Sequence, residues 1–407
     1  MPLASSSLVQ VRYIKESSFG VTPVAGNPKN LRITGESLSY SLSKSSSDEI
    51  NAYRAVTSMV ATSAEASGSI NAEMQFGEYD DLMAGVLQST WGAFGTNGLG
   101  VAFSATLTGT TITASAPTVG TSLFTLLKAG QWFTLDGTGT ANDGKMFRVS
   151  KSIPPTSTVI TLDTGTPALA GGPYAATVLK VSRLSNGTTQ PSYTIERAST
   201  DTGEFFAYRG MTPSSLKVSI SSGSLSTMEF AFMGRDAVAA NATTLPGVPV
   251  ASQAFPIMSG VSGTACALWA KGAPLAGTFV NSISLSYDNT LRAQSAICSP
   301  GSIGIGSGTI NVTADLEVYF ANGRAFYDEF LSNANMEIAF TTFDTQGNGY
   351  IFTLPQANIS SYSLNAGGKD QDLMASISVT GLLDLGNADA ALRKVMFIDR
   401  VGAALVP

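Results

Sequence analysis

Hydrophobic and polar residues alternate with a period of two along most of the chain. The segment 31–45 alternates Leu38, Tyr40 and Leu42 with serine, and the segment 277–291 has a similar alternation. Successive side chains of a β-strand point to opposite faces, so this pattern is typical of a strand with one buried face. The pattern recurs in further segments, which predicts a mainly β protein: 68–76, 191–199, 204–234, 308–320, 336–344 and 349–381.

Two short segments have helical spacing instead. In 79–91, Leu82, Met83 and Val86 form one stripe, and 326–334 is the second predicted helix. Both helices begin with acidic residues, which the helix dipole favours in the first turn. We therefore interpret Asp80 and Asp81 as helix-start charges rather than as an acid pair or a metal site.

The predicted elements occur twice in the same order. The words at 67–82, 191–199 and 204–234 correspond in sequence order to those at 307–330, 335–343 and 349–381. Chance matches between generic strand patterns would not keep that order. The sequence therefore predicts two copies of one β-rich unit, each with a single short helix.

The first copy is interrupted by a stretch that has no counterpart in the second. This stretch contains short strand patterns separated by turn signals such as Ala-Asn-Asp-Gly-Lys, which is typical of a small β-barrel or sandwich. Insertions are tolerated in loops, so we expect a separable inserted domain. The predicted domains are a discontinuous first copy, the insert and a second copy: 1–98 with 186–245, 99–185, and 246–407.

The composition favours a protein with large buried interfaces. Hydrophobic residues make up 43% and charged residues only 13% of the 407 residues, and the net charge is −6. The apolar content is sufficient for real cores, and charged residues are depleted where subunits meet. A free nucleic-acid-binding protein would carry a basic patch, and the sequence contains no basic run.

Several kinds of chemistry are disfavoured by the residues present. The chain has no histidine, which removes the usual general base and nearly all zinc sites. The two cysteines, Cys266 and Cys298, have no metal-ligand spacing. We therefore expect no enzyme activity, no metal and no cofactor. With no basic-then-apolar leader and no run of eighteen apolar residues, we expect a soluble protein made in a cytoplasm, without a membrane partner.

The order of the sequence words resembles the tail tube proteins of long-tailed, siphovirus-type bacteriophages. The resemblance covers nearly the whole chain except the insert and rests on these words: ESSFGVTP (16–23), LRITGESLSYS (31–41), FAFMGRDA (230–237), SISLSYDN (282–289), LPQANI (354–359) and GGKDQDLMASISV (367–379). It implies two copies of a tail-tube β-sandwich or barrel unit. The insert resembles the extra β domain that some of these proteins display outside the tube.

The resemblance also implies a function and partners. Family members form stacked rings, and the viral DNA passes through the lumen without specific binding. An acidic chain fits this role, because every lysine or arginine contact to phosphate adds affinity. The implied location is the virion tail after assembly in the host cytoplasm, and the implied partners are other copies of the chain, the tape measure protein and the tail terminator and tip proteins.

The resemblance directs attention to the ring and its contacts. Rings with one unit per chain are hexameric, so two units per chain favour a trimer with pseudo-sixfold symmetry, with a hexamer as the alternative. The long segment 43–67 resembles the loop that reaches the neighbouring ring, and its alternative interpretation is a disordered surface loop. The candidates for inter-ring contact are Asp48, Glu49, Ile50, Tyr53, Arg54, Val56 and Met59, and those for an N-terminal arm are Leu8, Val11 and Tyr13, where an ordinary first strand would show the same pattern.

Other functions remain open at this point. Low charge and many Ser and Thr residues also fit a secreted β-rich adhesin or surface-layer protein, although a signal peptide is missing. A capsid or tail decoration protein is a further alternative. A glycan-active enzyme would need two carboxylates, and the only tempting pairs, Asp80–Asp81 and Asp370–Asp372, are explained by a helix start and a turn.

Overall fold

The structure is a computed structural model that describes residues 5–93, 103–114, 124, 127–163, 169–261, 268–271, 273–274, 279–320 and 324–402. It is 53% strand and 6% helix, which confirms the mainly β class. The two predicted helices are present as α1 (Asp80–Val86) and α2 (Arg324–Ser332). α1 is shorter than predicted, whereas α2 has about its predicted length, and each follows a long strand.

A first series of antiparallel strands builds one half of the main sheet. β5 pairs with β3 and β4 on one side and with β16 on the other, and β16 pairs with β15. The first half of β15 pairs with β14 and β17, and β14 pairs with β1, which also pairs with β2. The bounds are β1 (Val9–Lys15), β2 (Lys29–Leu31), β3 (Gly35–Glu36), β4 (Ser39–Ser46), β5 (Met59–Glu73), β14 (Tyr193–Ser199), β15 (Glu204–Ser221), β16 (Thr227–Gly234) and β17 (Asp236–Ala240).

A second series repeats this order of pairings. β23 lies between β20 and β26, β26 pairs with β25, and the first half of β25 pairs with β24 and β27. β18 covers the edge of β24 and continues into β19. The bounds are β18 (Leu268–Ala270), β19 (Ala273–Pro274), β20 (Val280–Asp288), β21 (Arg292–Gln294), β22 (Gly304–Gly306), β23 (Asn311–Tyr319), β24 (Met336–Phe343), β25 (Gly349–Ala366), β26 (Leu373–Leu382) and β27 (Phe397–Val401), with 3-10 turns at Ser6–Leu8 and Ala390–Leu392.

One strand pair joins the two series into a continuous sheet, and we call it the internal joint. The second half of β15 pairs with β20 from Ser215 opposite Asp288 to Ser221 opposite Ser282. Leu216 and Val218 of β15 and Leu285 and Tyr287 of β20 are buried there. The core cluster runs through the joint without interruption and includes side chains of both series.

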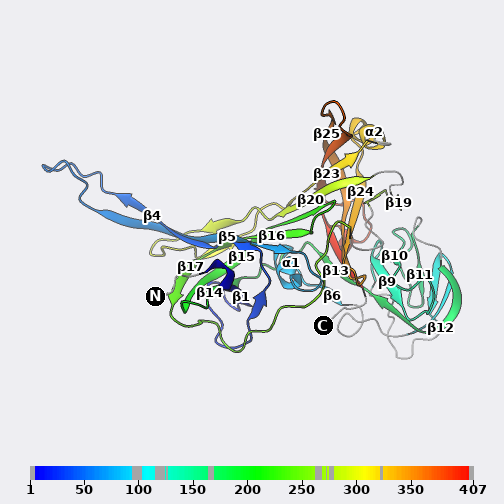
Figure 1. Cartoon of the computed structure of the whole chain (residues 1–407), viewed down its shortest axis with the longest axis horizontal. Coiled ribbons are helices and arrows are strands. Elements are labelled where there is room, and N and C mark those ends of the chain that lie inside the picture. The colour runs from blue at the N-terminus through cyan, green and yellow to red at the C-terminus, as the bar shows by residue number, and fades with distance from the viewer. Residues whose placement is uncertain are drawn as a thin grey trace.

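The turns beyond the joint differ between the two series. In the first, β4 and β5 extend away from the body as a long ribbon that ends in the loop 47–58 (Figure 1), and we call this ribbon with its loop the arm. In the second, the corresponding ribbon ends in the hairpin β21–β22, which lies against the first series. There the Ala64 N–H donates to the Pro300 carbonyl at 2.7 Å, and the Ser302 hydroxyl donates to the Gly234 carbonyl at 3.3 Å.

The insert forms a separate sheet beside the main one (Figure 1). It has six strands and a hydrophobic core of its own. The strand order is β10-β9-β12-β7-β8-β11, and a single bridge between Val149 and Leu162 brings the two end strands together. The strands themselves form no closed barrel in the described residues. The bounds are β7 (Phe103–Gly109), β8 (Thr111–Ala114), β9 (Trp132–Asp136), β10 (Met146–Arg148), β11 (Val159–Thr161) and β12 (Leu169–Lys180).

The insert leaves and re-enters the main sheet through two neighbouring short strands, which we call the stem. β6 (Gly92–Ala93) pairs with β13 (Ser182–Ser185), and β13 also pairs with β27. In these pairings Arg183 lies opposite both Gly92 and Asp399. The residues 182–185, which the sequence analysis assigned to the insert, are therefore hydrogen-bonded into the main sheet.

Candidate assembly surface

The strand β4 has one edge without a partner. In the part of the chain that the structure describes, β4 pairs only with β5. Tyr40 and Leu42 on this strand are partly exposed although they alternate with serine as buried residues do. An unpaired strand edge presents backbone N–H and C=O groups that can pair with another chain. We call this edge the β4 edge.

The end of β25 has a second such edge. Among the described strands, β24 and β27 pair with β25 only as far as Ala357, so the segment from Ser361 to Ala366 pairs with β26 alone. The Tyr362 ring packs between α2 and the sheet, with ring centroids 5.4 Å from Tyr327 and 6.5 Å from Phe330. Aromatic contacts of this kind hold the strand end in place. We call this segment the β25 edge.

The arm carries all seven candidates for inter-ring contact. The Ile50 side chain is 100% exposed and that of Tyr53 is 89% exposed, so the loop buries almost nothing in the subunit. Its hydrogen bonds are local: the Asn51 side chain donates to the Ala55 carbonyl at 2.7 Å, and the Thr57 hydroxyl donates to Glu49 at 2.9 Å. The loop thus has a local backbone framework and presents apolar side chains to solvent. The seven candidates on the arm are Asp48, Glu49, Ile50, Tyr53, Arg54, Val56 and Met59.

The N-terminal candidates lie in two different environments. Val11 and Tyr13 belong to β1 and are buried in the subunit's own core, whereas Leu8 precedes the strand and is half exposed. The Tyr13 hydroxyl donates to Asp81 at 3.2 Å, and burial raises the pKa of Tyr13 well above its ordinary value. The alternation therefore marks an ordinary first strand, and only Leu8 of the three is available for contact with a neighbouring subunit.

The acidic pair at the start of α1 has structural partners. Asp80 is buried, forms an ion pair with Arg400 and accepts a hydrogen bond from the Tyr350 hydroxyl at 2.5 Å. Burial raises the pKa of the Asp80 carboxyl, although Arg400 and Tyr350 act in the opposite direction. Asp81 pairs with Lys29 on β2. Asp80 thereby ties the helix of the first series to β25 and β27 of the second, and no group of three or more potential metal ligands occurs in the described residues.

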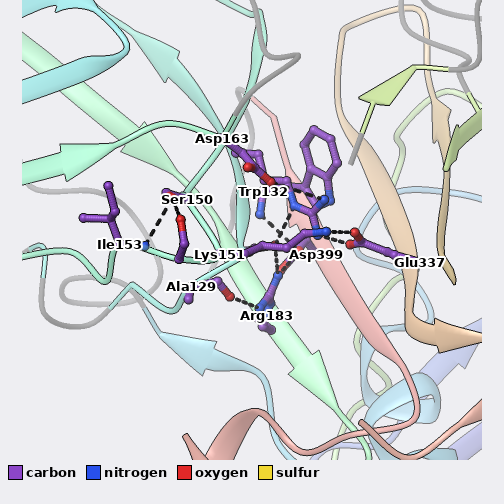
Figure 2. A network of polar contacts seen from close by, with 12 residues as sticks. Ala129, Trp132, Ser150, Lys151, Ile153, Asp163, Arg183, Glu337 and Asp399 are labelled. Atoms are coloured by element: carbon purple, nitrogen blue, oxygen red, sulfur yellow. Dashed lines mark hydrogen bonds and ion pairs between the residues drawn. The ribbon is translucent and has the colours of Figure 1, made fainter. Parts of the chain in front are cut away.

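Charged residues fix the insert to the second series, as Figure 2 shows. The guanidinium of Arg183 in the stem donates to both Asp399 oxygens, at 2.7 and 2.6 Å, and to the Gly130 carbonyl of the insert at 2.8 Å. The backbone N–H of Trp132 donates to Asp399 at 3.2 Å. Arg148 and Lys151 of the insert both form ion pairs with Glu337 of β24. Asp399 is fully buried. Removing one partner of a buried ion pair destabilises the fold, because the other charge is left buried and unpaired.

Apolar packing accompanies these ion pairs. The Trp132 and Trp269 rings meet edge to face with centroids 4.7 Å apart, and the Arg148 guanidinium lies 4.9 Å above the Trp132 ring. Met146 of the insert and Phe343 of the second series belong to the same small cluster. This contact was not predicted from the sequence, since the five charged residues are scattered between positions 148 and 399.

The described surface therefore offers two open strand edges and an apolar arm. A family model described as "Phage tail tube protein" matches residues 6–381. The chain belongs to the phage tail tube protein family. Members of this family are structural, so this tail tube protein is a structural component of the virion tail that associates with itself and with other tail components.

Two further findings complete the comparison. None of the curated proteins searched matches this tail tube protein. Across the described residues, no helix is both long and apolar enough to cross a membrane.

Proposed function

We propose that this tail tube protein polymerises into stacked rings that form the tube of a siphovirus-type tail, through which genomic DNA passes. The observation that supports this most directly is the pair of open edges. One edge lies on β4 and the other on β25, at opposite ends of one order of paired strands. Two different edges on one molecule give a head-to-tail contact, and such contacts close into rings when the rotation permits.

The repeated pairing order supports three chains per ring. β5, β16 and β15 of the first series have the same neighbours as β23, β26 and β25 of the second. We interpret the chain as two copies of one unit, so three chains supply six units with pseudo-sixfold symmetry. A ring of six chains remains the alternative.

The insert belongs on the outside of this tube. It packs against β24, β25 and β27 through Arg148 and Trp132, with Arg183 of the stem beside them, and neither open edge takes part in that contact. A domain placed there leaves both edges free for ring formation. The acidic net charge of −6 suits a duct that DNA passes without being held. The tape measure protein and the tail terminator and tip proteins are the further partners expected of such a tube.

The arm supplies the contact between stacked rings. Ordering a loop costs roughly 1 kcal/mol or more per residue in conformational entropy. Burial of Ile50, Tyr53 and Val56 offsets part of that cost at about 25 cal/mol per Å² of apolar area. A single arm then binds weakly, and a complete ring binds strongly because several arms act together.

Shortening the arm tests this role. Ser46 and Met59 are the last paired residues of the ribbon, so an Asn-Gly turn can replace residues 47–58 without changing the strands. We expect a folded subunit that forms rings but fails to elongate. Hydrogen exchange of the wild type should show the loop unprotected in free subunits and protected in tubes. Equal protection in both states would remove the stacking role.

Electron microscopy of the purified protein tests the proposal as a whole. Rings or tubes are expected, and class averages of end views count the chains by the number of inserts around the circumference. Three inserts indicate the trimer and six the hexamer. A protein that stays monomeric under all conditions that preserve its fold would favour a decoration or surface protein instead.

A further inference from the structure

We propose that the β25 edge of one chain pairs with the β4 edge of a second copy, antiparallel and in the register of the internal joint. In this register Tyr362 lies opposite Tyr40 and Ser363 opposite Ser39 of the second copy. Leu364 then lies beside Leu38, whose side chain is buried and whose backbone N–H and C=O bond to Glu36 and to the Tyr208 hydroxyl of its own subunit, so the new strand ladder ends at Ser39. The inference rests on the proposed ring, and it names the surface and the partner that close it. Three observations carry it.

The first observation is that β4 and β20 occupy equivalent places. The word Ser-Leu-Ser-Tyr occurs at 37–40 and again at 284–287. Tyr40 lies opposite Ala66 of β5, and Tyr287 lies opposite Val312 of β23. Ala66 lies four residues before Ile70, which pairs with Phe230 of β16, and Val312 lies four residues before Leu316, which pairs with Ile377 of β26. The second half of β15 pairs with β20 in the joint, so the strand equivalent to β15 is the one expected to pair with β4.

The second observation is that β15 and β25 are equivalent residue by residue. Each has 18 residues and carries two irregularities of its pairing, one against the preceding strand and one against the following strand. Leu216 lies opposite Phe230, and Tyr362 lies opposite Ile377, in matching places two residues after the second irregularity. Bulges recur at fixed places within related sheets and so align two strands without ambiguity.

The third observation is chemical complementarity in that register. In the joint, Leu216 lies opposite Tyr287 and Val218 opposite Leu285, with polar pairs such as Lys217 and Ser286 between them. The proposed contact places Tyr362 opposite Tyr40 and Ser363 opposite Ser39, with Leu364 beside the buried Leu38. A shift by one residue would exchange the two faces of the strand and place apolar side chains opposite serine.

Cysteine pairs test the register directly. Residues that lie opposite each other in an antiparallel pair have Cα atoms about 4.5–5.5 Å apart, which a disulfide bridges. In a background of Cys266→Ser and Cys298→Ser, the variant Ser39→Cys/Ser363→Cys is assembled under reducing conditions and then oxidised. Each bridge joins two thiols of different chains with loss of two protons and two electrons to the added oxidant. We expect a ladder of covalent multimers on a non-reducing gel, and a ladder that stops at the trimer would count the chains in the ring.

Two matched variants make the result interpretable. Lys217→Cys/Ser286→Cys places cysteines at the equivalent positions of the joint and should give an internal bridge without multimers. Ser39→Cys/Asn365→Cys is displaced by two residues on the same face and should cross-link weakly. Tubes that form while only the displaced pair cross-links would overturn the register.

Hydrogen exchange provides a second measurement on the wild-type protein. The alternate amides of residues 39–42 and 361–365 that do not bond to β5 or β26 should be exposed in free subunits and protected in tubes. Tubes in which both segments exchange freely would overturn the pairing while leaving the proposed function intact. Absence of rings and tubes by microscopy, together with free exchange, would instead contradict the proposed function on which the pairing rests.

Discussion

The internal joint and the two open edges use equivalent strands, yet they differ sharply in burial. Tyr287 is fully buried in the joint, whereas Tyr40 in the equivalent place is 38% exposed. Val218 is 1% exposed, and the equivalent Leu364 is 46% exposed. The sequence pattern is the same in both places, and at Tyr40 and Leu364 the strand that covers the equivalent residue in the joint is missing. Leu38, the equivalent of Leu285, is buried by its own subunit instead. Exposed apolar residues in a row along a strand edge mark a contact surface rather than ordinary surface variation.

The largest effect on stability and assembly should come from introducing an aspartate at equivalent positions of the joint and of the β25 edge. Val218→Asp introduces an unpaired carboxylate into the buried joint, which typically costs several kcal/mol. We expect the subunit to lose its cooperative unfolding transition or to be recovered as aggregate. Leu364→Asp changes the equivalent position of the open edge, where water solvates the charge. That variant should melt within a few degrees of the wild type but form no rings.

Circular dichroism melting and negative-stain microscopy on the same samples separate the two outcomes. Leu364→Asn serves as a control for polarity without charge and should weaken assembly less. If Leu364→Asp assembled as well as the wild type, the β25 edge would not be a ring contact. If Val218→Asp were as stable as the wild type, the joint would not be part of the core.

The contact between the insert and the second series differs from the internal joint, because buried ion pairs rather than paired strands hold it together. Asp399→Ala leaves Arg183 buried without its carboxylate, and breaking such a pair typically costs about 3–5 kcal/mol. The matched control is Asp136→Ala, which removes the partner of Lys180 at an exposed position and should cost no more than about 1 kcal/mol. Urea unfolding of both variants measures the difference, and equal costs would show that the buried pair contributes nothing special.

The same contact changes what a deletion of the insert should do. The sequence predicts a separable domain, but Trp269, Phe343 and Glu337 of the second series pack against the insert. A deletion of residues 94–181 would expose them to water. We therefore expect a less stable, aggregation-prone subunit unless these three residues are made polar or neutral at the same time. A simple deletion that retained wild-type stability would contradict the importance of this contact.

The smallest effect concerns the hydroxyl group of Tyr287 in the joint. Burial raises the pKa of Tyr287 above its ordinary value of about 10. The unfolded chain therefore releases this proton first, so the stabilising contribution is complete below pH 10 and is lost as the pH rises beyond 10. Tyr287→Phe should reduce this alkaline loss and change the stability at pH 7 by less than about 1 kcal/mol. Urea unfolding at several pH values checks it, and an unchanged alkaline slope would contradict the prediction.

Local patterns predicted the element types well, because period and caps depend on neighbouring residues. The alternation around Leu38 and Tyr40 and the helix at Asp80 are both present in the structure. The residue-by-residue alignment of the two series was harder to predict from the sequence. Matching sequence words aligned Ile70 with Ile310, whereas the strand pairings make Leu316 the equivalent of Ile70, six positions further. Since side chains alternate with a period of two, an even slip keeps every residue on its correct face, and the pattern cannot reveal it.

Contacts between distant segments were not predictable from one sequence. Asp80 meets Arg400 and Tyr350 from the other half of the chain, and Arg183 meets Asp399 from its end. Nothing local distinguishes these charges from those on the surface. The arm was predictable only in part. A long polar segment between two strands has no core of its own, but the sequence predicted a loop over 43–67, whereas residues 43–46 and 59–67 pair as strands. The role of its seven residues in ring contact stays a prediction.

The stem of the insert has a practical consequence for engineering. Gly92 and Arg183 are opposite each other in paired strands, so the two points where the insert departs and returns lie one strand spacing apart, about 4.8 Å. A foreign domain whose own termini are adjacent could be grafted onto this stem without stretching the scaffold. The grafted domain would need a compatible face toward Trp269 and Glu337, and every copy of the subunit would then carry one such cargo at a regular spacing.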